Sequence, residues 1–138
     1  MLVGVIYERT HVREIAQYGG LAKTLPLYAI AFLIVTFSSI AVPMTNGFVG
    51  EFLILFGAFQ ALPVVAYISV LGVILGAAYM LWMVEKVFFG TEGKIVQKHS
   101  NMPDMNLREI LTLAPLIALI FWMGLWPTQF LKLSLIHI

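Results

Sequence analysis

Three long apolar stretches dominate this chain of 138 residues and restrict what it can fold into. They run over residues 25–61, 63–89 and 110–126. Charged residues make up only 11% of the chain, whereas soluble domains carry about 25%. This charge is too sparse to cover a globule in water, so the expected surroundings are lipid. The sequence predicts an all-α fold, namely a fragment of a polytopic transmembrane helix bundle.

Composition argues against two kinds of site. The formal net charge is +1 and the basic residues form no blocks, so nucleic-acid binding is not expected. The chain has no cysteine, and its three histidines (His11, His99 and His137) are far apart in the sequence. No metal-ligand spacing occurs, and we expect no metal site.

We do not expect the amino-terminal residues to form a signal peptide, because no basic segment precedes the apolar run and no small-residue cleavage site follows it. Residues 1–7 are apolar but too few to cross a bilayer. They are typical of the end of a helix whose beginning is missing. We therefore expect the chain to be a fragment of a longer protein.

The first apolar stretch is interrupted at Pro43–Gly47 by a proline, two small polar residues and a glycine. Pro43 cannot donate a backbone hydrogen bond, and it disfavours helix in the preceding residue. Thr45 or Asn46 can cap a new helix by accepting hydrogen bonds from its first free N–H groups. We expect one helix over 26–42, a break near Pro43 and a second helix from about Gly47. The residues that would support this break are Pro43, Thr45, Asn46, Gly47 and Gly50.

Two topologies fit the broken stretch, because 26–42 and 47–61 are either separate spans or two halves of one discontinuous span. Lysine and arginine gather around two connectors, residues 8–23 and 90–106, whereas the turn at 60–63 has no charge. A single crossing leaves both basic connectors on one side of the membrane, and a double crossing separates them. The positive-inside rule favours the single crossing, with both connectors cytoplasmic.

The third apolar stretch carries its own start signal. Asn106 precedes it, and Glu109 follows three residues later, as in a capping box. Pro115 lies inside the stretch and should kink the helix.

Glu51 is the clear exception to the placement of ionisable residues outside the apolar stretches. No other charge is close to it in the sequence GFVGEFLIL. A charged side chain at the bilayer centre costs about 2.5–3.5 kcal/mol, and such residues commonly face the bundle interior and move protons or ions. Gly47, four residues earlier, shares its helical face and leaves space for water or a partner helix. The pattern indicates proton transfer at Glu51; the alternative is a structural glutamate bonded to backbone or to a lysine elsewhere.

Three blocks of sequence resemble a known family. They are YERTHVREIAQYGGLAKTLP, FSSIAVPMTNGFVGEFLILFGAF and the FFG that ends the second apolar stretch. Together they resemble the C-terminal part of subunit M, an antiporter-like membrane subunit of respiratory NADH:quinone oxidoreductase (complex I). The resemblance covers about residues 1–130, and GFVGEFLIL after a proline-containing break is its most specific element. Residues 131–138 do not continue the family pattern and stay unassigned.

The resemblance implies a proton-translocating subunit of which the last few spans are present. It implies that the span at 26–61 is discontinuous and that Glu51 holds the terminal proton-transfer position, with lysine and glutamate partners on earlier spans that this chain lacks. It also implies a bacterial inner membrane location, with protons, lipid and other membrane subunits of complex I as partners. NADH, FMN, iron–sulfur clusters and quinone would bind to other subunits, and no cofactor to this chain.

A subunit of a related multisubunit cation/proton antiporter is the nearest alternative, because both kinds of protein share the broken helix. Co-purification with NADH-oxidising subunits would separate the two. A third hypothesis is a passive membrane scaffold in which Glu51 is structural.

Overall fold

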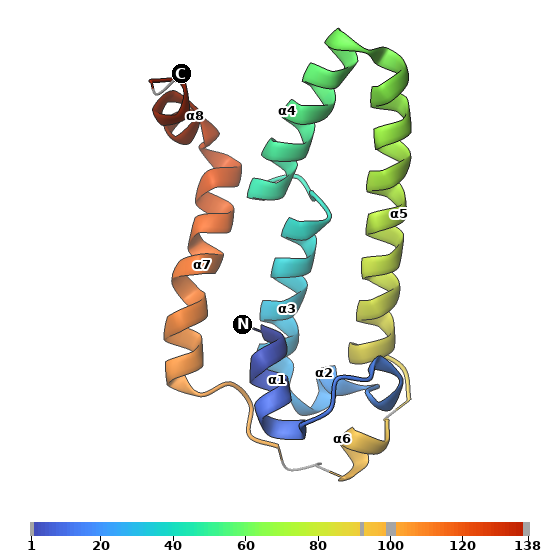
Figure 1. Cartoon of the computed structure of the whole chain (residues 1–138). Coiled ribbons are helices and arrows are strands. Elements are labelled where there is room, and N and C mark those ends of the chain that lie inside the picture. The colour runs from blue at the N-terminus through green and yellow to red at the C-terminus, as the bar shows by residue number, and fades with distance from the viewer. Residues whose placement is uncertain (1, 92, 99–101, 137–138) are drawn as a thin grey trace. The chain divides into compact units, whose positions relative to one another are not determined.

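The computed structural model describes residues 2–91, 93–98 and 102–136, and every regular element in these ranges is a helix (Figure 1). The all-α prediction is therefore confirmed. His99 and His137, together with parts of the second connector and of the unassigned tail, lie outside the described residues. The helices are α1 (Leu2–Thr10), α2 (Leu21–Thr24), α3 (Pro26–Ser39), α4 (Asn46–Ala61), α5 (Pro63–Phe88), α6 (Lys94–Lys98), α7 (Leu107–Leu125) and α8 (Pro127–Ile136), with a 3₁₀ turn at Ile15–Gln17.

Helices α5 and α7 are long and apolar enough to cross a bilayer, by length and composition. Their most apolar windows have mean hydropathies of 2.2 and 1.6, and only 6% of each window is buried. Helices α3 and α4 are apolar but shorter, with 14 and 16 residues. Neither reaches the about 20 residues of a perpendicular crossing. The core helix of a soluble protein is mostly buried, so these exposed apolar surfaces suit lipid or neighbouring helices.

Helix α3 ends at Ser39 and not at residue 42, which corrects the predicted boundary. If the helix continued, the ring of Pro43 would clash with the carbonyl of Ser39, four residues earlier. The Val42 N–H instead reaches back to the Phe37 carbonyl at 3.0 Å, a longer loop than the helical pattern makes. The chain resumes helix at Asn46, close to the predicted restart.

Helix α7 begins at Leu107, directly after Asn106, where the predicted capping box opens the span and three residues before the apolar stretch at 110–126. The Asn106 N–H donates to Oε2 of Glu109 at 2.8 Å, which confirms this half of the predicted capping box. Pro115 lies inside α7 without ending the helix.

The chain folds into two compact units. Unit 1 comprises Met1–Ile34 and Tyr79–Ala114, and unit 2 comprises Val35–Ala78 and Pro115–Ile138. Helices α3, α5 and α7 therefore each contribute one end to unit 1 and the other end to unit 2. The break and helix α4 belong wholly to unit 2.

Unit 1 has a core of aromatic and aliphatic side chains. The rings of Tyr28 and Phe88 stack with centroids 5.8 Å apart, and the Tyr28 hydroxyl donates to the carbonyl of Leu2 at 3.0 Å. Leu21 and Leu25 are 0% and 1% exposed. These contacts hold α1, α2, the start of α3 and the end of α5 together.

The two basic connectors meet in unit 1. The Gly93 N–H donates to the carbonyl of Gly19 at 3.2 Å, and the Gly20 N–H donates to the carbonyl of Phe89 at 3.3 Å. A Cβ on Gly19 or Gly93 would collide with the facing backbone, so this close approach requires glycine on both sides. The connectors therefore lie at the same end of unit 1.

In unit 2, α4 and the first half of α5 form an antiparallel helical hairpin (Figure 1). Leu62 makes the turn, and its N–H donates to the carbonyl of Ala58 at 2.8 Å. Pro63 opens α5, where its fixed φ and missing N–H suit the first helical position. The rings of Phe59 and Tyr67 pack edge to face across the hairpin, 6.0 Å apart.

Candidate functional site

The break between α3 and α4 holds two non-glycine residues in the left-handed region of the backbone. The φ angle is +55° at Ala41 and +77° at Met44. This region costs an L-residue about 1–2 kcal/mol. Such a conformation persists only where the surroundings impose it. The conformation of the break is therefore imposed by the residues around it.

Polar side chains of the break bond to each other and to its backbone. The Ser38 hydroxyl donates to Oδ1 of Asn46 at 2.5 Å, and the Thr45 hydroxyl donates to the carbonyl of Val42 at 2.6 Å. Thr45 occupies the N-cap position of α4, but its side chain makes no capping hydrogen bond. The prediction that Thr45 or Asn46 caps α4 by its side chain is wrong, because Thr45 makes no such bond and Asn46 is already the first residue of the helix.

Two predicted glycines of the break differ in their surroundings. A Cβ on Gly47 would collide with the carbonyl of Ser38, so the first turn of α4 lies directly against the last turn of α3. We expected this space to hold water or a partner helix, and the structure fills it with α3. A Cβ on Gly50 would meet no heavy atom within 4 Å among the residues that the structure describes. Pro43 itself is exposed within the break.

Glu51 lies one turn after Gly47, on the same face of α4. Its side chain is partly exposed, but Oε2 is buried and has no hydrogen-bond partner in the described part of the chain. Buried polar atoms are nearly always bonded, and an unbonded carboxylate oxygen is costly. An exception of this kind points either to a functional group or to a partner on another segment. Glu51 is the candidate site residue for this reason.

A second polar cluster lies in unit 1, and sequence reasoning did not assemble it. Nη2 of Arg9 pairs with Oε2 of Glu109 at 2.8 Å, with side chains 13% and 19% exposed. The same nitrogen donates to the carbonyl of Asp104 at 3.2 Å. The Asp104 carboxylate accepts from the N–H groups of Leu27 at 2.9 Å and Tyr28 at 3.2 Å, at the start of α3. These charged groups are satisfied, which is typical of a structural cluster.

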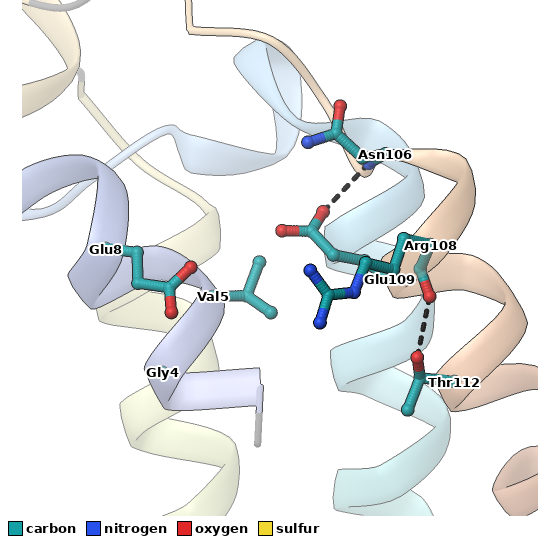
Figure 2. Close-up of a pocket in the computed structure, with 7 residues that line it drawn as sticks. All are labelled: Gly4, Val5, Glu8, Asn106, Arg108, Glu109 and Thr112. Carbon is teal, nitrogen blue, oxygen red and sulfur yellow. Dashed lines mark hydrogen bonds between the residues drawn. The ribbon is translucent and has the colours of Figure 1, made fainter.

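An open hollow of ≈ 550 Å³ lies beside this cluster (Figure 2). Figure 2 shows that it is lined by α1 and by the start of α7, through Gly4, Val5, Glu8, Asn106, Arg108, Glu109 and Thr112. The Glu109 carboxylate is already bonded to Asn106, and the Thr112 hydroxyl donates to the carbonyl of Arg108 at 2.6 Å. Glu8 and Arg108 are exposed. The hollow therefore lacks the unpaired buried group that marks Glu51.

Metal ligands do not gather in the part of the chain that the structure describes. No three His, Cys, Asp or Glu side chains of these residues are close enough to hold an ion. The chemistry that the described residues offer at the break is that of a lone carboxyl group, which can accept and release a proton.

Comparison with known proteins places the chain in a family. A sequence model of the family described as "NADH:quinone oxidoreductase/Mrp antiporter, TM" matches residues 1–74. The chain belongs to this family. Residues 1–74 include the break and Glu51.

Individual relatives carry complex I names. The chain is 45% identical over 132 residues to NADH-quinone oxidoreductase subunit M of Rickettsia prowazekii, and 43% identical over 133 residues to NADH-ubiquinone oxidoreductase chain 4 of Marchantia polymorpha. Each match covers 96% of this chain and 26% of the relative. A chain of respiratory complex I from Thermus thermophilus with bound NADH matches the fold, with a TM-score of 0.78, 38% identity, and coverage of 91% of this chain and 26% of that chain. The chain thus spans about a quarter of the length of these relatives.

Proposed function

We propose that this chain is part of a proton-translocating membrane subunit of a NADH:quinone oxidoreductase, in which Glu51 accepts and releases a proton. One observation carries the proposal: Oε2 of Glu51 is buried and unbonded in the restarted half of a broken helix. Hydrogen bonds and nearby cations favour the charged form of a carboxyl group. The buried Oε2 has neither among the described residues, so it is free to accept a proton. Family membership and the names of the relatives agree with this role.

The same proposal includes a single crossing by the discontinuous span at 26–61, with spans at 63–89 and 110–126 and both connectors on the cytoplasmic face of a bacterial inner membrane. Its support is the backbone pairing of Gly19 with Gly93 and of Gly20 with Phe89. Connectors that hydrogen-bond to each other lie on one side of a bilayer. The chain must then cross the bilayer an even number of times between the two connectors. One crossing by the span at 26–61 and one by α5 meet this condition.

We further propose that this chain carries no redox group. Electron transfer from NADH to quinone, through FMN and iron–sulfur clusters, would take place in other subunits of the complex, and this chain would contact its neighbouring membrane subunits, lipid and protons. The support concerns the iron–sulfur clusters, because this chain offers none of the cysteines that hold them.

A subunit of a multisubunit cation/proton antiporter is the second candidate, because the matching family is described by both NADH:quinone oxidoreductase and Mrp antiporter. Purification of the full-length subunit separates the two. NADH-oxidising subunits in the purified complex support the oxidoreductase, and a membrane complex without them supports the antiporter.

The test is Glu51→Gln in the full-length subunit, measured as NADH-driven proton uptake by inverted membrane vesicles per assembled complex. Glutamine keeps the size of the side chain and removes its titration. We expect proton uptake to fall about tenfold or more, as for the loss of a proton-transfer group. Glu85→Gln is the matched control, because Glu85 is exposed near the end of α5, and it should leave uptake unchanged. Normal uptake in an assembled Glu51→Gln complex would overturn the proposal.

A further inference from the structure

Gly124 of α7 lies directly against the break in unit 2. A Cβ on Gly124 would collide with the carbonyl oxygen of Met44, and it would also overlap the carbonyl carbons of Met44 and Thr45. All of these are main-chain atoms, which cannot rotate aside like the end of a flexible side chain. The backbone of α7 therefore touches the backbone of the break, and only glycine permits this contact.

The contact falls on the most constrained point of the break. Met44 has φ of +77°, and Thr45, which follows it, is 4% exposed and occupies the N-cap position of α4. The hydrogen bonds from Ser38 to Asn46 and from Thr45 to Val42 hold the break from within. Helix α7 supplies a contact from outside these two helices, at the residue whose conformation most needs support.

We propose that Gly124 is a positioning residue for proton transfer at Glu51. By letting α7 seat against Met44 and Thr45, it fixes where α4 restarts and therefore where Glu51 lies along its proton path. Thr45 and Glu51 belong to the cap and the second turn of one continuous helix, so a displaced restart carries the carboxylate with it. The inference rests on the proposed function of Glu51.

The first experiment is Gly124→Ala in the full-length subunit of the intact complex. The added methyl group must push α7 and the break apart. We expect proton uptake per assembled complex to fall about tenfold, because a displacement of about 1 Å in a reacting group can cost on the order of 10²-fold in rate. Gly57→Ala is the matched control, because a Cβ on Gly57 of α4 would meet no heavy atom within 4 Å among the described residues. Unchanged uptake in Gly124→Ala would overturn the inference.

A second variant separates positioning from general damage. Met44→Gly, added to Gly124→Ala, removes the restriction on a residue with φ of +77° and lets the peptide after residue 44 turn its carbonyl away from the new methyl group. We expect the double variant to recover at least half of the lost uptake per assembled complex. A double variant that stays as low as Gly124→Ala would show a packing defect elsewhere in α7 and overturn the inference. If Gly124→Ala alone does not assemble, the double variant tests the inference in its place. A contact between Gly124 and Met44 predicts that the double variant recovers both assembly and proton uptake.

Glu51→Gln, measured in parallel, distinguishes failure of this inference from failure of the proposed function. Loss of uptake in Glu51→Gln with normal uptake in Gly124→Ala overturns the positioning role alone. Normal uptake in Glu51→Gln overturns both.

Discussion

The two units of this chain differ in how their partly buried carboxylates are bonded. In unit 1, Arg9, Asp104 and Glu109 bond to one another and to the start of α3. In unit 2, Glu51 keeps a buried oxygen with no partner in the described part of the chain. Fully bonded charges rigidify a fold, whereas a buried unbonded carboxylate oxygen costs stability. This difference supports the proposal that Glu51 in unit 2 transfers protons, whereas the cluster in unit 1 is typical of a structural role.

The backbones of the two units differ as well. Unit 1 joins its connectors by hydrogen bonds between glycine-containing segments, and its core is built on Tyr28 and Phe88. Unit 2 interrupts its helix at the break. Positive φ does not separate the units, because Ala41 and Met44 of the break share it with His11 of the first connector. One end of α3 is thus anchored while its other end leads into the break.

The largest expected effect concerns the side of the membrane on which each connector lies. Single cysteines at Lys23, Lys94 and Gln60, which are all exposed, report this in a full-length subunit without other cysteines. We expect a membrane-impermeant maleimide to label positions 23 and 94 only from the cytoplasmic side and position 60 only from the other side, because one broken span and α5 separate the connectors. Labelling of positions 23 and 94 from opposite sides would contradict the description of unit 1, because connectors on opposite sides of the membrane cannot hydrogen-bond to each other.

The second largest effect is expected for replacement of Asp104. Asp104→Ala removes the acceptor for the N–H groups of Leu27 and Tyr28. We expect the free energy of unfolding to fall by about 1–2 kcal/mol, as for loss of a helix N-cap. Thermal unfolding of the detergent-purified protein measures the change. Asp104→Asn keeps one acceptor oxygen and should lose less; equal losses in the two variants would contradict the capping role.

The smallest effect is expected for Arg9. Arg9→Ala breaks the pair with Glu109, which is partly buried and therefore less screened by salt than a surface pair. The expected loss of unfolding free energy is about 1 kcal/mol. Arg13→Ala is the control, because the Arg13 guanidinium lies over the ring of Tyr7 at 4.4 Å, an exposed contact that contributes about 0.5 kcal/mol. Proton uptake per assembled complex should not change in either variant. A fall in uptake in Arg9→Ala would contradict a purely structural role for the cluster in unit 1.

Local signals predicted much of this arrangement. Pro43 predicted the break, and Asn106 with Glu109 predicted the start of α7, because helix termination and capping depend on residues that are close in sequence. The end of α3 was placed too late because the proline acts on the carbonyl of Ser39, four residues before it. The prediction that Thr45 caps α4 by its side chain was wrong, because the Thr45 oxygen accepts no N–H of α4 and its hydroxyl donates to the carbonyl of Val42.

Contacts between distant segments could not be predicted from one sequence. Nothing near Gly124 in the sequence points to Met44, and nothing near Asp104 points to Leu27. A glycine within an apolar helix is a signal of close packing, but it does not name its neighbour. Glu51 was found because a carboxylate in an apolar stretch is conspicuous without any partner.

The central claim is that Glu51 changes its protonation during turnover, and infrared difference spectroscopy of the intact complex tests it most directly. Spectra recorded with and without NADH and quinone turnover report the C=O stretch of protonated carboxyl groups. A carboxyl band that changes on turnover in the unmodified complex and in Glu85→Gln, but is lost in Glu51→Gln, is the result that this account predicts. Spectra in which Glu51→Gln retains every turnover-dependent carboxyl band would contradict it.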